Sequence, residues 1–378
     1  MDFGLTQEQD DLKALAKKMF DELSPAERLP DFDTGQDWFD EKLWQELAKA
    51  QLLGIALPED VGGVGMGLVE LALLLEQAGA ACCPVPLLAT LVMGAAPVNE
   101  FGTEAQRKAL LPEVIAGKLV LTAALADEGS REPSEPTTRA TADGGDWRLT
   151  GTKLFVPAAR LAGRVLVPAR TSDADVGVFL VDPRADGVTL VPTTTTTGEY
   201  QYRIDFDSAL VTDADVLGDP TGGRAIVEWI VERTLAGLCA TELGVAERAL
   251  RMTATYASER KQFDKPIATF QAVAQRAGDA YIDIEAIRLS TLQAVWRLAT
   301  GRPAARELAI AKFWASEGGH RACYAAQHLH GGIGVDTDYP LHHYYLLSRQ
   351  IELTLGSGQA QLARIGRMLA DDEWASLS

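Results

Sequence analysis

The period of hydrophobic and polar positions changes twice along the chain. Residues 1 to about 118 repeat apolar side chains at helical spacing, first after Thr6 and Gln9, which form a capping-box pattern. Between about 119 and 222, short runs rich in β-branched and aromatic residues alternate with Gly, Pro and Asp turns, which predicts strands. Long helical patterns then return. We therefore expect an α+β protein with a helical domain over 1–118, a β domain over 119–222 and a helical domain over 223–378.

Each domain has its own expected organisation. In the β domain the expected strands are WRLTGTKLFV, RVLVPAR, VGVFLVD, GVTLVP and EYQYRIDFDSALV, which would form a barrel or sandwich. The polar stretch from Glu128 to Asp146 is expected to be a loop. In the C-terminal domain, breaks at KPIATF, GRPAARE and HGGIGVDTDYP separate long helices and predict a four-helix bundle.

Composition narrows the possible classes of partner. The 378 residues carry a formal net charge of −18, so nucleic acid and anionic membrane surfaces are poor partners. No run of 18 apolar residues is present, and the opening residues MDFGLTQEQDD lack the basic and apolar blocks of a signal peptide. We therefore expect a cytoplasmic location. The four cysteines lack metal-ligand spacing, so no metal site is expected.

Two C-terminal motifs carry the candidate chemistry. In the first, Arg260 and Phe263 precede Pro266, and a cation beside an exposed ring can bind a diphosphate and stack on an adenine. The second, HLHGGIGV, contains a Gly-Gly-x-Gly turn that lets backbone N–H groups approach a phosphate closely. Singly, the motifs also fit a solvated charge run and an ordinary helix-to-loop turn. Their order and separation in one chain favour a nucleotide site.

The segments SERKQFDKPIATFQAVAQ and HLHGGIGVDTDYPLHHYY resemble the two C-terminal signatures of the acyl-CoA dehydrogenases. The helix–β–helix order fits that family over essentially the whole chain. In the family, FAD lies across a subunit interface, and these signatures hold the adenosine diphosphate end of a flavin whose ring sits in a neighbouring subunit. The resemblance implies that Arg260 and Phe263 contact the diphosphate and adenine, that Gln271 lines the site, and that Gly331 and Gly332 pack on the phosphates.

Two residues depart from the family signatures. Asp264 replaces the usual Gly after the aromatic residue, which puts an acid beside the diphosphate. His328 replaces the usual Gln at the head of the glycine turn, so the resemblance assigns this histidine to the cofactor site.

The family removes the α-proton of an acyl thioester and transfers the β-hydrogen to flavin as hydride, which requires a carboxylate base. In many members the base lies near the C-terminus, where this chain has Leu355. Other members carry it in a Glu-Arg pair on a bundle helix, about 28 residues before the Arg-x-x-Phe motif. Glu232 and Arg233 fit that spacing, since 260 − 232 = 28, which implies Glu232 as base and Arg233 beside the acyl group. The pair also fits an ordinary exposed helix surface, like Glu228 and Glu242 on the same helix.

The middle domain departs most from the family. Where the family has Trp-Ile-Thr-Asn against the flavin ring, this chain has Phe155 and Pro157 within LFVPA. Pro157 provides neither an N–H nor a hydroxyl, whereas Phe155 can still stack on the ring. The residues expected to bind the adenosine half of FAD thus match the family's signatures better than the residues expected to contact the flavin ring.

This asymmetry resembles the paired acyl-CoA dehydrogenases of bacterial steroid and fatty-acid catabolism, which assemble as α2β2 tetramers. The resemblance implies FAD, an acyl-CoA substrate, and an electron-transfer flavoprotein or similar acceptor, with homo- or hetero-oligomeric assembly. Two alternatives remain open: a non-enzymatic scaffold or partner subunit that completes the adenosine site, and a flavin enzyme of the same fold that uses oxygen.

Overall fold

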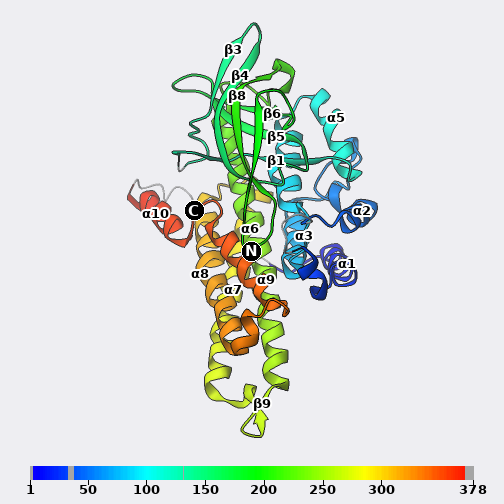
Figure 1. Ribbon diagram of the computed structural model, residues 1–378, viewed down its shortest axis with the longest axis vertical. Helices are drawn as coiled ribbons and strands as arrows, with labels where there is room; N and C mark the ends of the chain where they lie inside the picture. The colour runs from blue at the N-terminus through cyan, green and yellow to red at the C-terminus, as the bar shows by residue number, and fades with distance from the viewer. Residues whose placement is uncertain (1–2, 33–37, 131, 371–378) are drawn as a thin grey trace. The chain divides into compact units, whose positions relative to one another are not determined.

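The computed structural model describes residues 3–32, 38–130 and 132–370 (Figure 1). Helices precede and follow a β region along the chain, so the expected α+β class is confirmed. The chain divides into two compact units. The first unit contains Met1–Asp33, Leu68–Cys83 and Leu235–Ser378, and the second contains Thr34–Gly67 and Pro84–Thr234. The boundary between the units falls inside helix α6, and each unit is described by itself.

The first unit is helical. Its helices are α1 (Gln7–Leu23), α3 (Leu68–Ala81), the later part of α6 (Gly223–Glu259), α7 (Gln271–Ala299), α8 (Ala305–His330), α9 (Leu341–Leu353) and α10 (Gly358–Ala370). Shorter elements are η1 (Ala26–Phe32), β9 (Lys261–Gln262), β10 (Lys265–Pro266), η6 (Ile267–Thr269) and η7 (Gly331–Val335). The three predicted breaks in the C-terminal helical pattern are therefore confirmed, since α7, α8 and α9 each begin within or directly after one of them.

The start of α1 confirms the predicted capping box. The Thr6 hydroxyl accepts a hydrogen bond from the Gln9 backbone N–H at 3.3 Å, and the Gln9 side chain accepts one from the Thr6 N–H at 3.0 Å. These bonds satisfy two N–H groups at the Thr6 end of the helix. Leu12, Ala16 and Phe20 then form the buried stripe of α1.

Helices α3 and α6 cross at two glycines. A Cβ atom on Gly79 would lie 2.1 Å from the Thr241 carbonyl oxygen, and one on Gly244 would lie 1.8 Å from the Glu76 carbonyl oxygen. Only glycine therefore allows the two backbones to approach this closely. Helix α9 is attached to the same region, because the Tyr344 hydroxyl donates to the Ala80 carbonyl oxygen at 3.1 Å.

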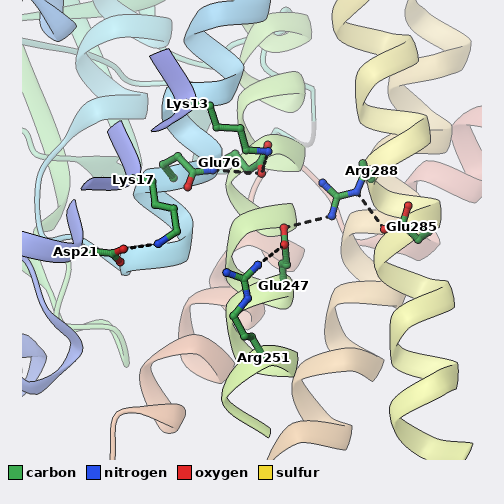
Figure 2. Close-up of polar contacts among 9 residues, drawn as sticks. Lys13, Lys17, Asp21, Glu76, Glu247, Arg251, Glu285 and Arg288 are labelled. Atoms are coloured by element: carbon green, nitrogen blue, oxygen red, sulfur yellow. Dashed lines mark hydrogen bonds and ion pairs between the residues drawn. The ribbon is translucent and has the colours of Figure 1, made fainter. Parts of the chain in front are cut away.

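Ion pairs connect neighbouring helices of the first unit (Figure 2). Lys13 of α1 lies 2.8 Å from Glu76 of α3. Glu247 of α6 pairs with Arg251 one turn later at 2.7 Å and with Arg288 of α7 at 3.2 Å. The Glu76 side chain is buried, whereas the other side chains are partly exposed. Water therefore screens the pairs of Glu247, and each of these contributes about 1 kcal/mol or less.

The second unit combines short helices with a sheet. Its helical elements are α2 (Glu41–Lys49), η2 (Leu52–Gly54), η3 (Glu59–Val61), the π-helical η4 (Leu88–Ala95), α4 (Ala96–Phe101), α5 (Glu104–Ile115), η5 (Asp213–Asp215) and the start of α6. Its strands are β1 (Val120–Ala123), β2 (Ala126–Asp127), β3 (Arg139–Asp143), β4 (Asp146–Pro157), β5 (Ala162–Arg170), β6 (Val176–Val181), β7 (Val188–Thr193) and β8 (Gln201–Val211).

The strands form one sheet in the order β1-β5-β3-β4-β8-β7, with β6 paired to β5 and β2 paired to β4. The five expected strands are all present, as β4 to β8. The expected loop between Glu128 and Asp146 is wrong in part, because it contains β3. This strand pairs with β4 through a hairpin at Gly144–Gly145. Only Ala140 of β3 is buried, so the strand has no apolar alternation that the sequence could reveal.

Within the described residues, no helix is both long enough and apolar enough to cross a lipid bilayer.

Candidate functional site

The two signature segments meet where α6 and α8 end. Tyr256, one turn before Arg260, stacks on His330, the last residue of α8, with ring centroids 4.4 Å apart and planes at 19°. The Tyr256 hydroxyl also donates to the His330 carbonyl oxygen at 3.4 Å. The structure therefore brings the Arg260 segment and the Gly331 turn together at one end of the first unit.

Phe263 and Asp264 form the two-residue turn between β9 and β10. Their φ angles are +53° and +64°, in the left-handed region that L-residues rarely adopt. Asp tolerates this conformation better than most residues, so the turn accommodates the replacement of the family's glycine. Phe263 is 87% exposed. An exposed ring on a backbone in this conformation is a feature that clusters at ligand-binding positions.

The remaining residues of the first motif frame this hairpin. The Arg260 carbonyl oxygen accepts from the Ile267 N–H at 2.8 Å, and the exposed Arg260 guanidinium forms no ion pair with any described residue. Phe270 meets the Phe263 ring edge-on at 6.3 Å. Gln271 follows as the exposed first residue of α7.

The glycine turn leaves an open backbone surface. Gly331 has φ +67° and ψ −139°, a combination available essentially to glycine alone. A Cβ atom on Gly331 or Gly332 would meet nothing within 4 Å, whereas one on Gly334 would lie 2.7 Å from the Gln327 carbonyl oxygen. Gly334 is thus needed for packing inside the chain. Gly332 has no such internal requirement, which fits a phosphate-bearing group that approaches from outside.

His328 lies on the exposed side of α8. Its Nδ1 contacts the Arg276 guanidinium of α7, and its ring stacks on Tyr324 at 6.5 Å. Arg276 therefore adds a second cation near the glycine turn, which the sequence had not singled out.

Glu232 and Arg233 lie on the part of α6 in the second unit. The Arg233 guanidinium lies over the Trp229 ring at 3.6 Å and 3.9 Å from the Glu232 carboxylate. Burial lowers the pKa of Arg233 to about 10, against the opposing effects of Glu232 and Glu100. The Glu232 side chain is 29% exposed. The sequence analysis did not predict the contact of Trp229 with Arg233, although the two residues are one helical turn apart in the sequence.

Phe155 lies at an irregularity of β4. The register between β4 and β8 shifts between Lys153 and Val156, and Phe155 has φ +51° and is 59% exposed. A bulge next to an exposed aromatic side chain is common beside binding sites. Pro157 ends the strand.

Lys153 and Asp127 form a buried ion pair that the sequence did not reveal. Asp127 also accepts hydrogen bonds from the backbone N–H groups of Thr137 and Thr138, both at 2.7 Å. Burial lowers the pKa of Lys153 to about 8, and Asp127 acts in the opposite direction. The Asp127 carboxylate therefore connects β2 to Lys153 of β4 and to the backbone at Thr137 and Thr138.

Leu355 occupies a loop that Lys312 fixes. The buried Lys312 ammonium donates to the carbonyl oxygens of Ile351 at 2.9 Å, Glu352 at 3.0 Å and Gly356 at 3.2 Å. Burial lowers the pKa of Lys312 to about 8. The loop path is thus set by a lysine of α8 rather than by the side chain at position 355. Leu355 itself has φ +55°.

The helix pattern suggested that Glu242 is an ordinary surface glutamate, and the structure shows that this is wrong. It is fully buried, and Ser348 donates to its Oε1 at 2.7 Å, while its Oε2 has no hydrogen-bond partner. Burial raises the pKa of Glu242 to about 8, against the effects of Ser348 and Lys312. In the part of the chain that the structure describes, no group of three or more His, Cys, Asp or Glu is placed to hold a metal ion.

Comparison with known proteins decides the family. The sequence matches the acyl-CoA dehydrogenase N-terminal domain over residues 6–118, the middle domain over 124–208 and the C-terminal domain over 221–370. The chain belongs to the acyl-CoA dehydrogenase family. This membership confirms the expected family, the expected oxidoreductase class and FAD as the cofactor of the family.

Individual relatives are similar over almost the full length. Acyl-CoA dehydrogenase FadE27 of Mycobacterium tuberculosis is 38% identical over 98% of this chain and 99% of that protein. A solved structure of the ChsE4–ChsE5 complex from Mycobacterium tuberculosis has a TM-score of 0.92 at 38% identity, covering 98% of this chain and 99% of that one. The Tcur3481–Tcur3483 steroid ACAD G363A variant has a TM-score of 0.90 at 42% identity, covering 97% and 99%.

Proposed function

We propose that this acyl-CoA dehydrogenase family member is one subunit of a heteromeric, FAD-dependent enzyme that introduces an α,β double bond into a steroid-type or fatty acyl-CoA thioester. Two similar solved structures are named as a complex of two chains, ChsE4–ChsE5, and as a steroid ACAD, Tcur3481–Tcur3483. The observation that carries the proposal is the stacking of Tyr256 on His330, which brings the two signature segments together.

The residues at this end of the first unit fit the adenosine diphosphate half of FAD. Arg260 would contact the diphosphate, Phe263 would stack on the adenine, and the open backbone at Gly331 and Gly332 would receive the phosphates. Gln271 and His328 would line the same site. When bound, FAD supplies the acceptor for the substrate's β-hydrogen.

Within this chain, Glu232 is the proposed base for the α-proton, and Arg233 is the proposed neighbour of the acyl group. Partial burial supports the proposal, because it keeps the pair away from full hydration while leaving Glu232 reachable. Phe155, exposed at its bulge, is the proposed contact to the flavin ring. An electron-transfer flavoprotein or a similar protein is the proposed electron acceptor.

A second candidate is a partner subunit that completes the adenosine site of a homologous catalytic chain. Leu355 at the position of the usual glutamate and Pro157 in the ring-contact segment favour it, because neither can supply the missing carboxylate or hydrogen bond. Both candidates share the Arg260 and Gly331 site and differ in the role of Glu232.

Flavin content and turnover test the proposal. The chain is purified alone and after co-expression with a homologous acyl-CoA dehydrogenase subunit, and flavins per chain are counted from the absorption spectrum. We expect stable FAD in the co-purified complex and dehydrogenation of a steroid side-chain CoA or a straight-chain acyl-CoA in an artificial-acceptor assay. A colourless complex without FAD affinity would contradict the proposal.

A further inference from the structure

His330 is the last residue of α8, directly before the glycine turn, and only 4% of it is exposed. Its Nδ1 lies 2.8 Å from the Ala326 carbonyl oxygen. Since a carbonyl oxygen only accepts, Nδ1 carries the proton in this contact. The other ring nitrogen, Nε2, is then an acceptor.

Tyr339 and Tyr256 complete the surroundings of this imidazole. The Tyr339 hydroxyl lies 3.2 Å from Nε2 and donates to it. The face of the ring stacks on Tyr256 of α6. One buried side chain therefore contacts the end of α6, the end of α8 and the segment that leads into α9.

We propose that His330 is a positioning residue for the nucleotide site, holding the Gly331–Gly332 turn in a fixed place relative to the end of α6 that carries Arg260. The inference rests on the proposed function, because it assigns the positioned site to FAD. His330 acts through the turn and through Tyr256, while Arg260, Phe263 and the glycine backbone face the ligand.

The chemistry of imidazole suits this role better than a purely aromatic ring. A phenyl ring at position 330 would keep the stacking on Tyr256 but would leave the Tyr339 hydroxyl without its acceptor. A leucine would lose both contacts. The neutral imidazole combines an aromatic face with a donor and an acceptor on two separate ring nitrogens, which neither phenylalanine nor leucine offers.

The arrangement also makes the site sensitive to acid. Burial lowers the pKa of His330 from its usual 6.5, although the Ala326 carbonyl opposes this effect. Protonation would place a second N–H at Nε2, where the Tyr339 hydroxyl now donates. The titratable groups around this set are Tyr256 and Glu259 of α6, Tyr339 itself, and His342 of α9, which contacts the Tyr339 carbonyl oxygen at 2.8 Å. FAD affinity should therefore fall as the pH drops through the lowered pKa of His330, which lies below the usual 6.5.

The test compares FAD affinity in the parent protein, His330→Phe and Tyr339→Phe. Affinity is measured by fluorescence quenching on each protein as it is isolated with its partner. Tyr281→Phe, at an exposed tyrosine of α7, is the matched control for the loss of one hydroxyl. We expect FAD affinity to fall about tenfold in His330→Phe and about threefold in Tyr339→Phe, with Tyr281→Phe unchanged. The loss of affinity at acidic pH should be absent in His330→Phe.

The outcomes separate this inference from the proposed function. If Arg260→Ala weakens FAD binding while both His330→Phe and Tyr339→Phe bind as tightly as the parent at every pH, the positioning role is wrong and the proposed site stands. If the parent protein binds no FAD, both are wrong. Should His330→Phe fail to fold, Tyr339→Phe decides alone, and unchanged affinity in that variant overturns the inference.

Discussion

Phe263 and Asp264 are consecutive residues in left-handed backbone conformation, with φ angles of +53° and +64°, at the tip of a hairpin whose aromatic ring is 87% exposed. Such a conformation costs an L-residue about 1–2 kcal/mol, so the turn is less stable than a glycine turn would be. Substitutions at these two positions should therefore affect stability and ligand binding in separable ways.

Phe263→Gly should stabilise the chain and weaken FAD binding. Glycine removes the left-handed penalty but adds freedom to the unfolded chain, so we expect a net gain of about 0.5–1 kcal/mol in the free energy of unfolding. Loss of the ring should lower FAD affinity about tenfold or more, since stacking on an aromatic side chain contributes about 1–3 kcal/mol per base. Chemical denaturation and FAD titration measure the two effects. A variant that is stabilised and binds FAD normally would show that Phe263 does not contact the adenine.

Asp264→Gly should stabilise the turn and strengthen FAD binding. The substitution removes a negative charge beside the proposed diphosphate, so FAD affinity should rise about two- to fivefold at low ionic strength, and the gain should shrink as salt is added. FAD titration at two salt concentrations is the measurement. Weaker binding at low salt would place the diphosphate elsewhere.

Arg260→Ala should lower FAD affinity by about one to two orders of magnitude, because a charge-assisted hydrogen bond to phosphate contributes about 1.5–3 kcal/mol. Flavin content after purification and the dissociation constant for added FAD measure this loss. Arg251→Ala is the matched control, since it removes the same charge from the last part of α6, where Arg251 pairs with Glu247. Equal flavin content in the two variants would exclude Arg260 from the site.

Glu232→Gln should abolish turnover while FAD content stays unchanged, if Glu232 is the base. A general base contributes about 10²–10⁴-fold to the rate, and the amide cannot accept the α-proton. Steady-state rates and the flavin spectrum are the readouts. Glu228→Gln, an exposed position one turn earlier on α6, serves as control. Parent-level activity in Glu232→Gln would favour the partner-subunit candidate.

Glu242→Gln should flatten the pH dependence of stability. The folded-state pKa of Glu242 is raised from 4.5 to about 8, so its stabilising contribution is fully present below about pH 4.5 and is lost as pH rises toward 8. Between pH 5 and 8 the parent should lose about 1–3 kcal/mol more than the variant, which stays neutral throughout. Denaturation curves at both pH values test this. An equal loss in the two proteins would mean that Glu242 is ionised at pH 5.

Local signals predicted the fold well because they act within a few residues. The Thr6 capping box, the alternation in Gln201–Val211 and the breaks before Gln271 and Leu341 each depend on neighbouring positions, and each is present in the structure. The strand Arg139–Asp143 could not be predicted in this way, since it has a single buried side chain and depends on pairing with β4.

The candidate site was predictable where a motif specified it. The sequence indicated that the Arg260 and Gly331 segments belong together, although it could not show that Tyr256 and His330 connect them. Lys153, Lys312 and Glu242 were missed because charged residues in a strand or helix pattern are usually solvated. Their burial follows from tertiary packing, to which a local pattern is blind.

The lysine at position 312 has a consequence for how such a chain can change over time. Its ammonium donates hydrogen bonds to backbone carbonyl oxygens on both sides of residue 355, so the side chain at that position has little part in maintaining the loop. A carboxylate can therefore be exchanged for an aliphatic group there with little effect on folding. The backbone of this loop is therefore compatible with either kind of side chain at position 355.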